Sequence, residues 1–228
     1  MQDLTLIQME VLKKLLFLKT AKFSDLKVEN ITSDLLSYHL RELVERGLIV
    51  KSENGYSLSS AGVDFAGRMD TDTKKIEKQP KVTMVLIVRK IEAGITYFLI
   101  QRRKKQPYFN FVGFPTGKLR YGETVIEGAD RELLEEANIK ARFTHSFVLH
   151  EMVYGIDKNI LEDKFFNIMS GEYTSGEIKD VEGGENFWSS LEEFYKLSPK
   201  YHNEDEIFNW YLNGQKDFVE KKYIVEGF

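Results

Sequence analysis

A loop glycine followed by a helix crowded with carboxylates is the part of this sequence best suited to chemistry. Thr124 and Glu127 have the spacing of a capping box, which predicts a helix over residues 124–137. Three glutamates of that helix stand at neighbouring positions on one surface. They are Glu132, Glu135 and Glu136. Carboxylates crowded in this way repel one another, so the arrangement requires either open solvent or a bound cation.

Two interpretations of this helix remain open. In the first, the glutamates form a solvated face, and Arg131 and Glu135 make an ordinary surface ion pair. In the second, they bind a hard divalent cation such as Mg²⁺ or Mn²⁺, which prefers oxygen ligands. The spacing of Val125, Ala129 and Leu133 turns the opposite side of the helix toward a sheet. The carboxylates are therefore free to face a cleft.

The spacing of the whole stretch from the glycine onward resembles the Nudix box. That pattern is Gly, five residues, Glu, seven residues, Arg-Glu, a bulky aliphatic residue, any residue, Glu-Glu, any residue, Gly and an aliphatic residue. The matching residues are Gly117, Glu123, Arg131, Glu132, Leu133, Glu135, Glu136 and Ile139. One position departs, since Asn138 stands where the family has glycine. We expect a left-handed backbone there, which asparagine tolerates best after glycine.

Resemblance to this family implies hydrolysis of a nucleoside diphosphate linked to another group, by attack of water on phosphorus. The implied cofactor is Mg²⁺, with Mn²⁺ as an alternative. The implied metal ligands are Glu132, Glu135, Glu136, Glu123 and the carbonyl group of Gly117. Glu132 matches either a ligand or the catalytic base, and Arg131 would orient the carboxylates.

Basic and aromatic residues precede the box and suggest how a nucleotide is held. Arginine side chains suit phosphate groups, and aromatic rings suit stacking on a base. The candidate substrate-binding residues are Arg102, Arg103, Tyr108, Phe111 and Lys118. The alternatives are a solvated turn for the charged run and packing against the sheet for the rings.

One further acid is expected outside the box. Many members of the family take a metal ligand or base from a loop ahead of a strand that contains tryptophan. Glu182 and Glu185 precede Trp188 and are the candidates for this catalytic role. A solvated acidic loop is the alternative, because other acids lie nearby in the sequence.

Composition limits the class of protein. The chain has 228 residues, of which 42% are hydrophobic and 30% charged, as in ordinary globular proteins. The absence of cysteine excludes disulfides, and four scattered histidines do not make a structural zinc site. The sequence has no signal region and no segment able to span a bilayer, so we expect a cytoplasmic protein without a membrane partner.

The order of the predicted elements divides the chain into two domains. The division is a first domain over residues 1–70, a linker over residues 71–80 and a second domain over residues 81–228. The linker is polar and ends in proline. The net charge is −4, and residues 1–70 carry nine basic against ten acidic side chains. Neither domain is therefore basic enough to attract nucleic acid through charge alone.

In the first domain, three helices are followed by a hairpin around Asn54 and Gly55. This is the order of a winged helix-turn-helix, and residues 36–43 resemble the recognition helix of ArsR-like and MarR-like regulators. The resemblance implies DNA contacts from Ser33, Ser37, Tyr38, His39, Arg41 and Lys51. The alternative is a module for docking or homodimer formation, because acidic residues share this helix.

In the second domain, strands alternate with helices. The predicted strands cover residues 82–88, 96–101, 143–154 and 163–169, and the predicted helices cover residues 124–137, 189–197 and 203–213. This pattern fits an α/β fold, the α/β/α sandwich with a mixed sheet that is expected of the Nudix family. The leading function is a Mg²⁺-dependent Nudix hydrolase with a nucleotide substrate. The rival is a nucleotide-sensing transcriptional regulator that binds ligand with the second domain and DNA with the first.

Overall fold

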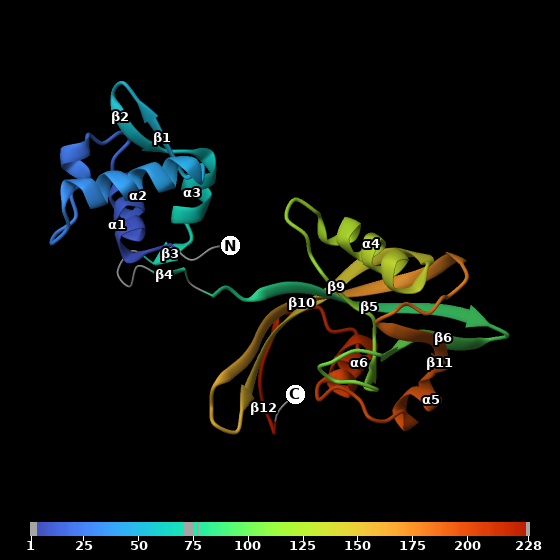
Figure 1. The fold of residues 1–228 in the computed structure, drawn as a ribbon. Helices are drawn as coiled ribbons and strands as arrows, with labels where there is room; N and C mark the ends of the chain where they lie inside the picture. Colours follow the sequence, from blue (N-terminus) through green and yellow to red (C-terminus); the bar gives the residue numbers. More distant parts are fainter. Residues whose placement is uncertain (1–3, 71–74, 77, 227–228) are drawn as a thin grey trace. The chain divides into compact units, whose positions relative to one another are not determined.

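A computed structural model describes residues 4–70, 75–76 and 78–226 of the chain (Figure 1). The chain forms two compact units, Met1–Lys78 and Gln79–Phe228. Their boundary falls within the segment 71–80 that the sequence predicts as a linker, and residues 71–74 and 77 of that segment lie outside the described part. Two described residues of the segment, Lys75–Ile76, form strand β4, which pairs with β3 (Met69–Asp70).

The N-terminal unit has helices packed with a two-stranded hairpin, in the order that the sequence predicts. Its elements are α1 (Leu6–Leu16), the 3-10 helix η1 (Phe23–Leu26), α2 (Ser33–Glu45), β1 (Ile49–Ser52), β2 (Gly55–Leu58) and α3 (Ser60–Ala66). Threonine side chains cap the first and third of these, Thr5 on α1 and Thr32 on α2. Leu12, Leu36 and Ile49 belong to one buried cluster, so the helices and the hairpin share a core.

The C-terminal unit is built on one eight-stranded mixed sheet. Its elements are β5 (Lys81–Glu92), β6 (Ile95–Arg103), β7 (Val112–Gly113), β8 (Thr116–Lys118), α4 (Val125–Ala137), β9 (Ile139–Gly155), β10 (Ile160–Gly176), β11 (Gly184–Ser190), α5 (Leu191–Lys196), α6 (Glu204–Leu212) and β12 (Val219–Val225). The strand order is β11-β6-β5-β10-β9-β12, with β7 paired to β6 and β8 paired to β5. β5 and β10 run parallel, as do β9 and β12, and the other pairs are antiparallel.

The alternation of side chains along β5 explains the layers on either side of the sheet. Met84 and Leu86 lie on the face that packs with Leu133 of α4, while Val85 and Ile87 lie in the cluster formed with α5 and α6. Helices therefore cover both faces, and the predicted α/β/α arrangement with a mixed sheet is confirmed (Figure 1). Strand β12, which pairs with β9, has no counterpart among the predicted strands. In the described part of the chain, no helix is both long and apolar enough to cross a membrane.

The glutamate-rich helix α4 begins and ends as its sequence predicts. The Thr124 hydroxyl accepts from the Glu127 amide, and the Glu127 carboxylate accepts from the Thr124 amide, which completes the capping box. Asn138 ends the helix in the left-handed region, with φ 58° and ψ 28°. In the adjoining strand β8, Gly117 pairs with Met84 of β5, so the loop glycine is fixed to the centre of the sheet.

Candidate active site

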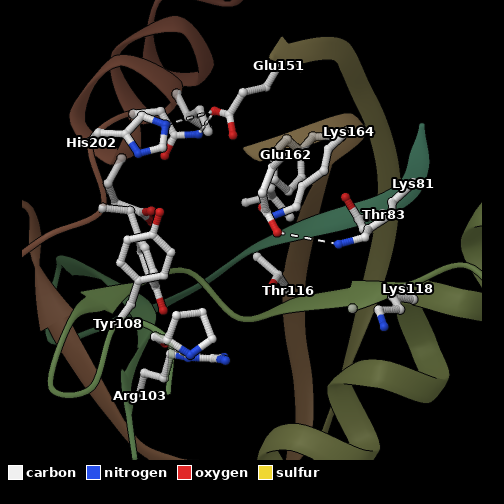
Figure 2. Close-up of a pocket in the computed structure, with 18 of the residues that line it drawn as sticks. Lys81, Thr83, Arg103, Tyr108, Thr116, Lys118, Glu151, Glu162, Lys164 and His202 are labelled. Atoms are coloured by element: carbon white, nitrogen blue, oxygen red, sulfur yellow. Dashed lines mark hydrogen bonds and ion pairs between the residues drawn. The ribbon is translucent and has the colours of Figure 1, made fainter. Parts of the chain in front are cut away.

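A cavity of about 560 Å³ opens in the C-terminal unit beside the glutamate-rich helix. Its walls come from elements that are far apart in the sequence. They include Lys81 and Thr83 of β5, Thr116, Gly117 and Lys118 of β8, Glu132 of α4, Glu151 of β9, Glu162 and Lys164 of β10, and the segment Tyr201 to Glu204 at the start of α6. Figure 2 shows Tyr108, Arg103 and His202 on one side of the cavity and Lys81, Lys118 and Lys164 across from them.

Lysine side chains make one wall of the cavity suitable for an anion, and Arg103 faces that wall from the other side. The cavity is lined by Lys81, Arg103, Lys105, Lys118 and Lys164. Among the described residues, neither Lys105 nor Lys118 makes an ion pair, so their charge is free for a ligand. Burial is the main cause that lowers the pKa of Lys164 to about 8. The nearby charge of Glu151 opposes this shift, and the charges of Lys81, Arg103 and Lys118 add to it.

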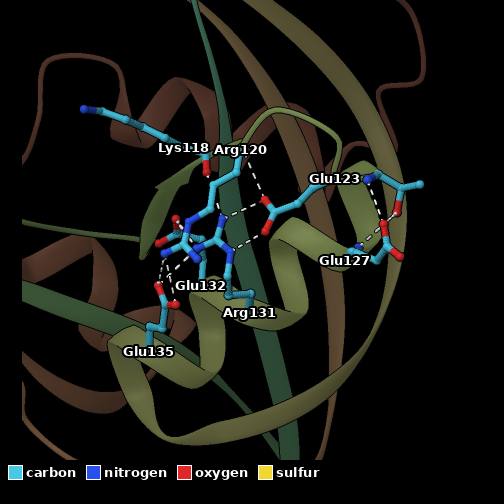
Figure 3. Close-up of polar contacts among 8 residues, drawn as sticks. Lys118, Arg120, Glu123, Glu127, Arg131, Glu132 and Glu135 are labelled. Carbon is cyan, nitrogen blue, oxygen red and sulfur yellow. Dashed lines mark hydrogen bonds and ion pairs between the residues drawn. The ribbon is translucent and has the colours of Figure 1, made fainter.

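Arg131 of α4 is the centre of a cluster of carboxylates from α4 and from the loop before it (Figure 3). Its Nε lies 2.6 Å from Glu123 Oε1 and its Nη2 lies 2.9 Å from Glu123 Oε2. Its Nη1 lies 2.7 Å from Glu132 Oε1 and 3.0 Å from Glu135 Oε2. The hydrogen bonds from Arg131 lower the pKa of Glu123 to about 2, and those carboxylates raise the pKa of Arg131. The cluster is thus held together by one guanidinium group.

Glu136 points toward a different set of neighbours. Its Oε2 accepts from Gln101 Nε2 at 3.0 Å, and Gln101 also contacts Asn186 of β11. In the parts of the chain that the structure covers, no three acidic or histidine side chains converge as a metal site. The predicted set of Glu132, Glu135 and Glu136 is consequently spread over two networks, one around Arg131 and one around Gln101, and its role in metal binding stays a prediction.

Acidic and amide side chains form the opposite end of the cavity. Glu151 is 2% exposed, and its Oε2 accepts from Asn203 Nδ2 and lies 3.4 Å from His202 Nε2. Glu204 is 6% exposed, and its Oε1 accepts from the Phe114 amide at 2.6 Å. Burial raises the pKa of Glu204 to about 8. The cavity therefore has a basic wall and a separate end rich in hydrogen-bond acceptors.

Five of the predicted site residues line this cavity. They are Gly117, Lys118, Glu132, Arg103 and Tyr108. Arg103 is tied to the loop that follows β6, since its Nε lies 2.5 Å from the Pro107 carbonyl oxygen. The ring of Tyr108 packs against Tyr201, with ring centroids 5.3 Å apart. Both residues therefore have fixed positions on the cavity wall.

Other predicted substrate-binding and catalytic residues do not line it. The Arg102 side chain donates to the Asn110 carbonyl, and Phe111 packs behind Tyr108 with ring centroids 5.2 Å apart. Glu185 of β11 lies 3.8 Å from Lys104, and Glu182 is exposed in the turn before β11. The acids that do line the cavity beside Glu132 are Glu151, Glu162 and Glu204. Sequence reasoning missed these three.

The predicted DNA-binding residues lie in the N-terminal unit, and one of them is buried. Ser33, Ser37, Tyr38 and Arg41 are exposed on α2, and Lys51 is exposed on β1. His39, by contrast, is 6% exposed. It follows Leu36 by three residues and precedes Leu40 by one, which is the spacing of the buried side of a helix. Burial of this side chain argues against a base contact by His39, and the DNA contacts of this unit stay a prediction.

The fold and the cavity together define an α/β/α protein with a pocket suited to an anionic ligand beside a glutamate-rich helix. Residues 78–211 match the family model described as the NUDIX domain. This match covers more than half of the chain, and the chain belongs to that family. None of the curated proteins compared matches the chain.

Several solved structures share the fold. The NUDIX domain of Shewanella oneidensis NrtR, complexed with ADP ribose, has a TM-score of 0.53 at 10% identity over 68% of this chain and 98% of that one. The mMutator MutT protein from Bacillus halodurans has a TM-score of 0.52 at 18% identity over 63% of this chain and 89% of that one. At such identities the likeness is one of fold.

Proposed function

We propose that the C-terminal unit hydrolyses a phosphoanhydride bond of a nucleoside diphosphate that carries a further group, and that it uses Mg²⁺ or Mn²⁺. The observation that carries this proposal is that Glu132 of the Nudix helix lines the same cavity as the basic wall. A chain of phosphates is the anion that several basic side chains around one cavity attract best. Candidate substrates include ADP ribose, the ligand named for the NrtR structure, as well as nucleotide sugars and nucleoside triphosphates.

The donor chemistry of the Nudix stretch fits a hard divalent cation. Carboxylate and carbonyl oxygens are the ligands that Mg²⁺ and Mn²⁺ prefer, and Glu132, Glu135, Glu136, Glu123 and the Gly117 carbonyl would hold the ion. A Cβ atom on Gly117 would lie 2.1 Å from Glu132 Cδ, so a larger residue at this position would displace the Glu132 side chain. A bound ion would neutralise phosphate charge and make a water molecule more acidic.

The protein's own side chains have separate tasks in this scheme. Arg131 orients Glu123 and Glu132 and keeps Glu123 ionised, since it lowers the pKa of that carboxyl to about 2. Lys118 holds the phosphates from the lysine wall, and Arg103 faces it from the opposite side of the cavity. Fixed charges of this kind stabilise the negative charge that grows in the transition state without reorganising solvent.

The test is the release of a nucleoside monophosphate from ADP ribose, NADH, nucleotide sugars and nucleoside triphosphates in the presence of Mg²⁺ or Mn²⁺. We expect turnover of at least one of these compounds, and a loss of roughly 100-fold or more in kcat for Glu135→Gln and Glu136→Gln. The matched control is Glu192→Gln, because Glu192 is an exposed helical glutamate of α5 that pairs with Lys196 away from the cavity. Absence of turnover across the whole panel would contradict the proposal.

We also propose a second role, in which the N-terminal unit is a winged helix-turn-helix domain that binds DNA. The exposed residues Ser37, Tyr38 and Arg41 of α2 support it, together with Lys51 on the hairpin. Nucleotide binding in the C-terminal unit would then regulate the chain's contact with DNA. Because Asp34 and other acids share α2, we expect this binding to depend on base contacts more than on phosphate contacts, and therefore to weaken only modestly with salt.

Selection on random DNA, followed by gel shifts with and without ADP ribose, tests this second role. We expect a defined site at modest salt and binding that is about tenfold weaker for Arg41→Ala, with Lys22→Ala as a control on the exposed surface ahead of η1. Sizing of the same protein tests the alternative use of the unit in homodimer formation. Enrichment of no sequence, together with a dimer that Arg41→Ala leaves intact, would contradict DNA binding.

A further inference from the structure

Glu151 is a buried carboxylate whose role the hydrolysis of a phosphoanhydride does not explain. It lines the cavity at the end remote from α4, and it is 2% exposed. Figure 2 shows it with dashed lines to side chains on the His202 side. Those two contacts, from Asn203 and His202, both go to its Oε2 atom. Among the described residues, the second oxygen, Oε1, accepts no hydrogen bond.

The surroundings of Glu151 do not supply an internal partner for that oxygen. Lys164 stands directly opposite Glu151 in the pairing of β9 with β10, yet its Nζ contacts Glu162 instead. Asn203 occupies the N-cap position of α6 without capping it, since its amide group is turned to Glu151. The Asn203 side chain therefore positions the Glu151 carboxylate instead of capping α6. An acceptor that faces the cavity and has no partner among the described residues can receive a hydrogen bond from a ligand that donates.

Glu204 extends the same acceptor-rich end. Its Oε1 is used by the Phe114 amide, while its Oε2 makes no hydrogen bond within the described residues. A Cβ atom on Gly113 would lie 2.6 Å from Glu204 Cδ, so glycine is required for the carboxyl group to sit against the backbone. Asn203 lies next to Glu204 in the chain and lines the same cavity. The end of the cavity therefore offers two open carboxyl oxygens beside an amide.

We propose that Glu151, held by Asn203 and flanked by Glu204, binds the exocyclic amino group of the substrate's nucleobase. This inference rests on the proposed function, because it assigns the substrate class at the same cavity. An amino group on a base has two N–H donors and no competing carbonyl lone pair, so it matches adjacent acceptors. Bases that present a carbonyl or hydrogen at that place leave Glu151 Oε1 unpaired, and an unpaired buried carboxylate disfavours binding.

A base fits this end better than a phosphate or a sugar does. A phosphate would be repelled by the Glu151 carboxylate and would meet no positive charge on Glu204, whereas the lysine side chains across the cavity attract it. The rings of Tyr108 and Tyr201 line the same end and provide flat surfaces for stacking, which a sugar does not require. The cavity is thus divided into a phosphate side near Glu132 and a base side near Glu151.

The experiment compares nucleotide pairs that differ only in one amino group. GTP is paired with ITP, and ATP with purine riboside triphosphate. Dissociation constants are measured by calorimetry in EDTA, so that they depend neither on a metal ion nor on turnover, and kcat/KM is measured with Mg²⁺. We expect the amino-bearing member of at least one pair to bind about tenfold or more tightly. In Glu151→Gln we expect that ratio to fall below about twofold.

Two further variants make the result decisive. Glu162→Gln removes another carboxylate from the same cavity but from the lysine side, and we expect it to change both members of a pair equally. Asn203→Ala removes the donor to Glu151, and we expect an intermediate ratio even if Glu151→Gln proves unstable in a melting experiment. Equal binding within every pair would overturn the inference, as would an unchanged ratio in Glu151→Gln. Binding preference without any turnover would overturn the proposed hydrolysis and leave the base site standing.

Discussion

Arg131 and Glu123 form a two-point ion pair, with Nε 2.6 Å from Oε1 and Nη2 2.9 Å from Oε2. The pair joins the loop after β8 to the middle of α4, eight residues further along the chain. The same guanidinium group also donates to Glu132 and to the Lys118 carbonyl, 3.0 Å away. Its planar fork makes these contacts simultaneously, which a lysine ammonium group cannot do.

Replacement of Arg131 by lysine should therefore be costly although it keeps the charge. We expect Arg131→Lys to lower Tm by about 2–4 °C and kcat/KM by about tenfold, because Glu123 and Glu132 lose their common donor. Differential scanning calorimetry and the hydrolysis assay measure the two effects. The control is Arg120→Lys. Arg120 is more exposed, and its side chain pairs with a single carboxylate, that of Glu135. Equal effects of the two substitutions would contradict this interpretation.

Asn138 offers a test of backbone conformation at the end of α4. Its φ of 58° lies in the left-handed region, and its Nδ2 donates to the Glu177 carbonyl at 3.1 Å. Asn138→Ala should reduce the free energy of unfolding by about 1 kcal/mol, because a Cβ without a polar group is disfavoured there. Asn138→Gly relieves the backbone but loses the hydrogen bond, so we expect a change within about 0.5 kcal/mol. Urea unfolding would contradict this if the alanine variant were the more stable of the two.

The parts of the structure that could be predicted from the sequence depend on residues close together in the chain. The capping box of Thr124 and Glu127 and the left-handed Asn138 are local features, and both are confirmed. The burial of His39 can also be predicted from the sequence, since His39 lies on the same side of the helix as Leu36 and Leu40. Resemblance to a recognition helix predicts an exposed residue at this position, whereas the spacing of the apolar residues around it predicts a buried one.

The residues of the cavity could not be predicted in this way. Glu151 faces Lys164 only because of the register between β9 and β10, which shifts at irregular positions. Glu204 reaches the Phe114 amide across 90 residues of sequence. Each of these acids looks like an ordinary surface residue in a strand or at a helix start, where acids are common. They can be recognised as site residues only from the contacts that they make with other segments in the folded chain.

Lys164 should make ligand affinity depend on pH. Burial lowers its pKa to about 8, so the side chain is charged at pH 7 and mostly neutral at pH 9. We expect the dissociation constant of a nucleoside diphosphate to rise about tenfold between these values, because one charge-assisted hydrogen bond is lost. Lys164→Arg keeps its charge throughout and should flatten the dependence. Glu204 ionises over the same range, so Lys164→Arg is best compared in the Glu204→Gln background. If the dissociation constant of the Lys164→Arg, Glu204→Gln double variant rises as steeply with pH as that of Glu204→Gln alone, another group causes the pH dependence.

Glu204 should likewise make the stability of the fold depend on pH. Burial raises its pKa from 4.5 to about 8, so the folded chain binds its proton more tightly than the unfolded chain does. Its contribution to stability is therefore fully present below pH 4.5 and is lost as the pH rises toward 8, by up to about 1.4 kcal/mol per pH unit.

Glu204→Gln keeps an acceptor for the Phe114 amide and cannot ionise, so we expect it to melt at a higher temperature than the natural chain at pH 8 and at a similar temperature at pH 5. Glu192→Gln, the exposed control, should show no such divergence. Parallel melting curves for Glu204→Gln and the natural chain from pH 5 to 8 would mean that the carboxyl group is solvated in the folded protein, and the acceptor-rich end of the cavity would then lose one of its two acids.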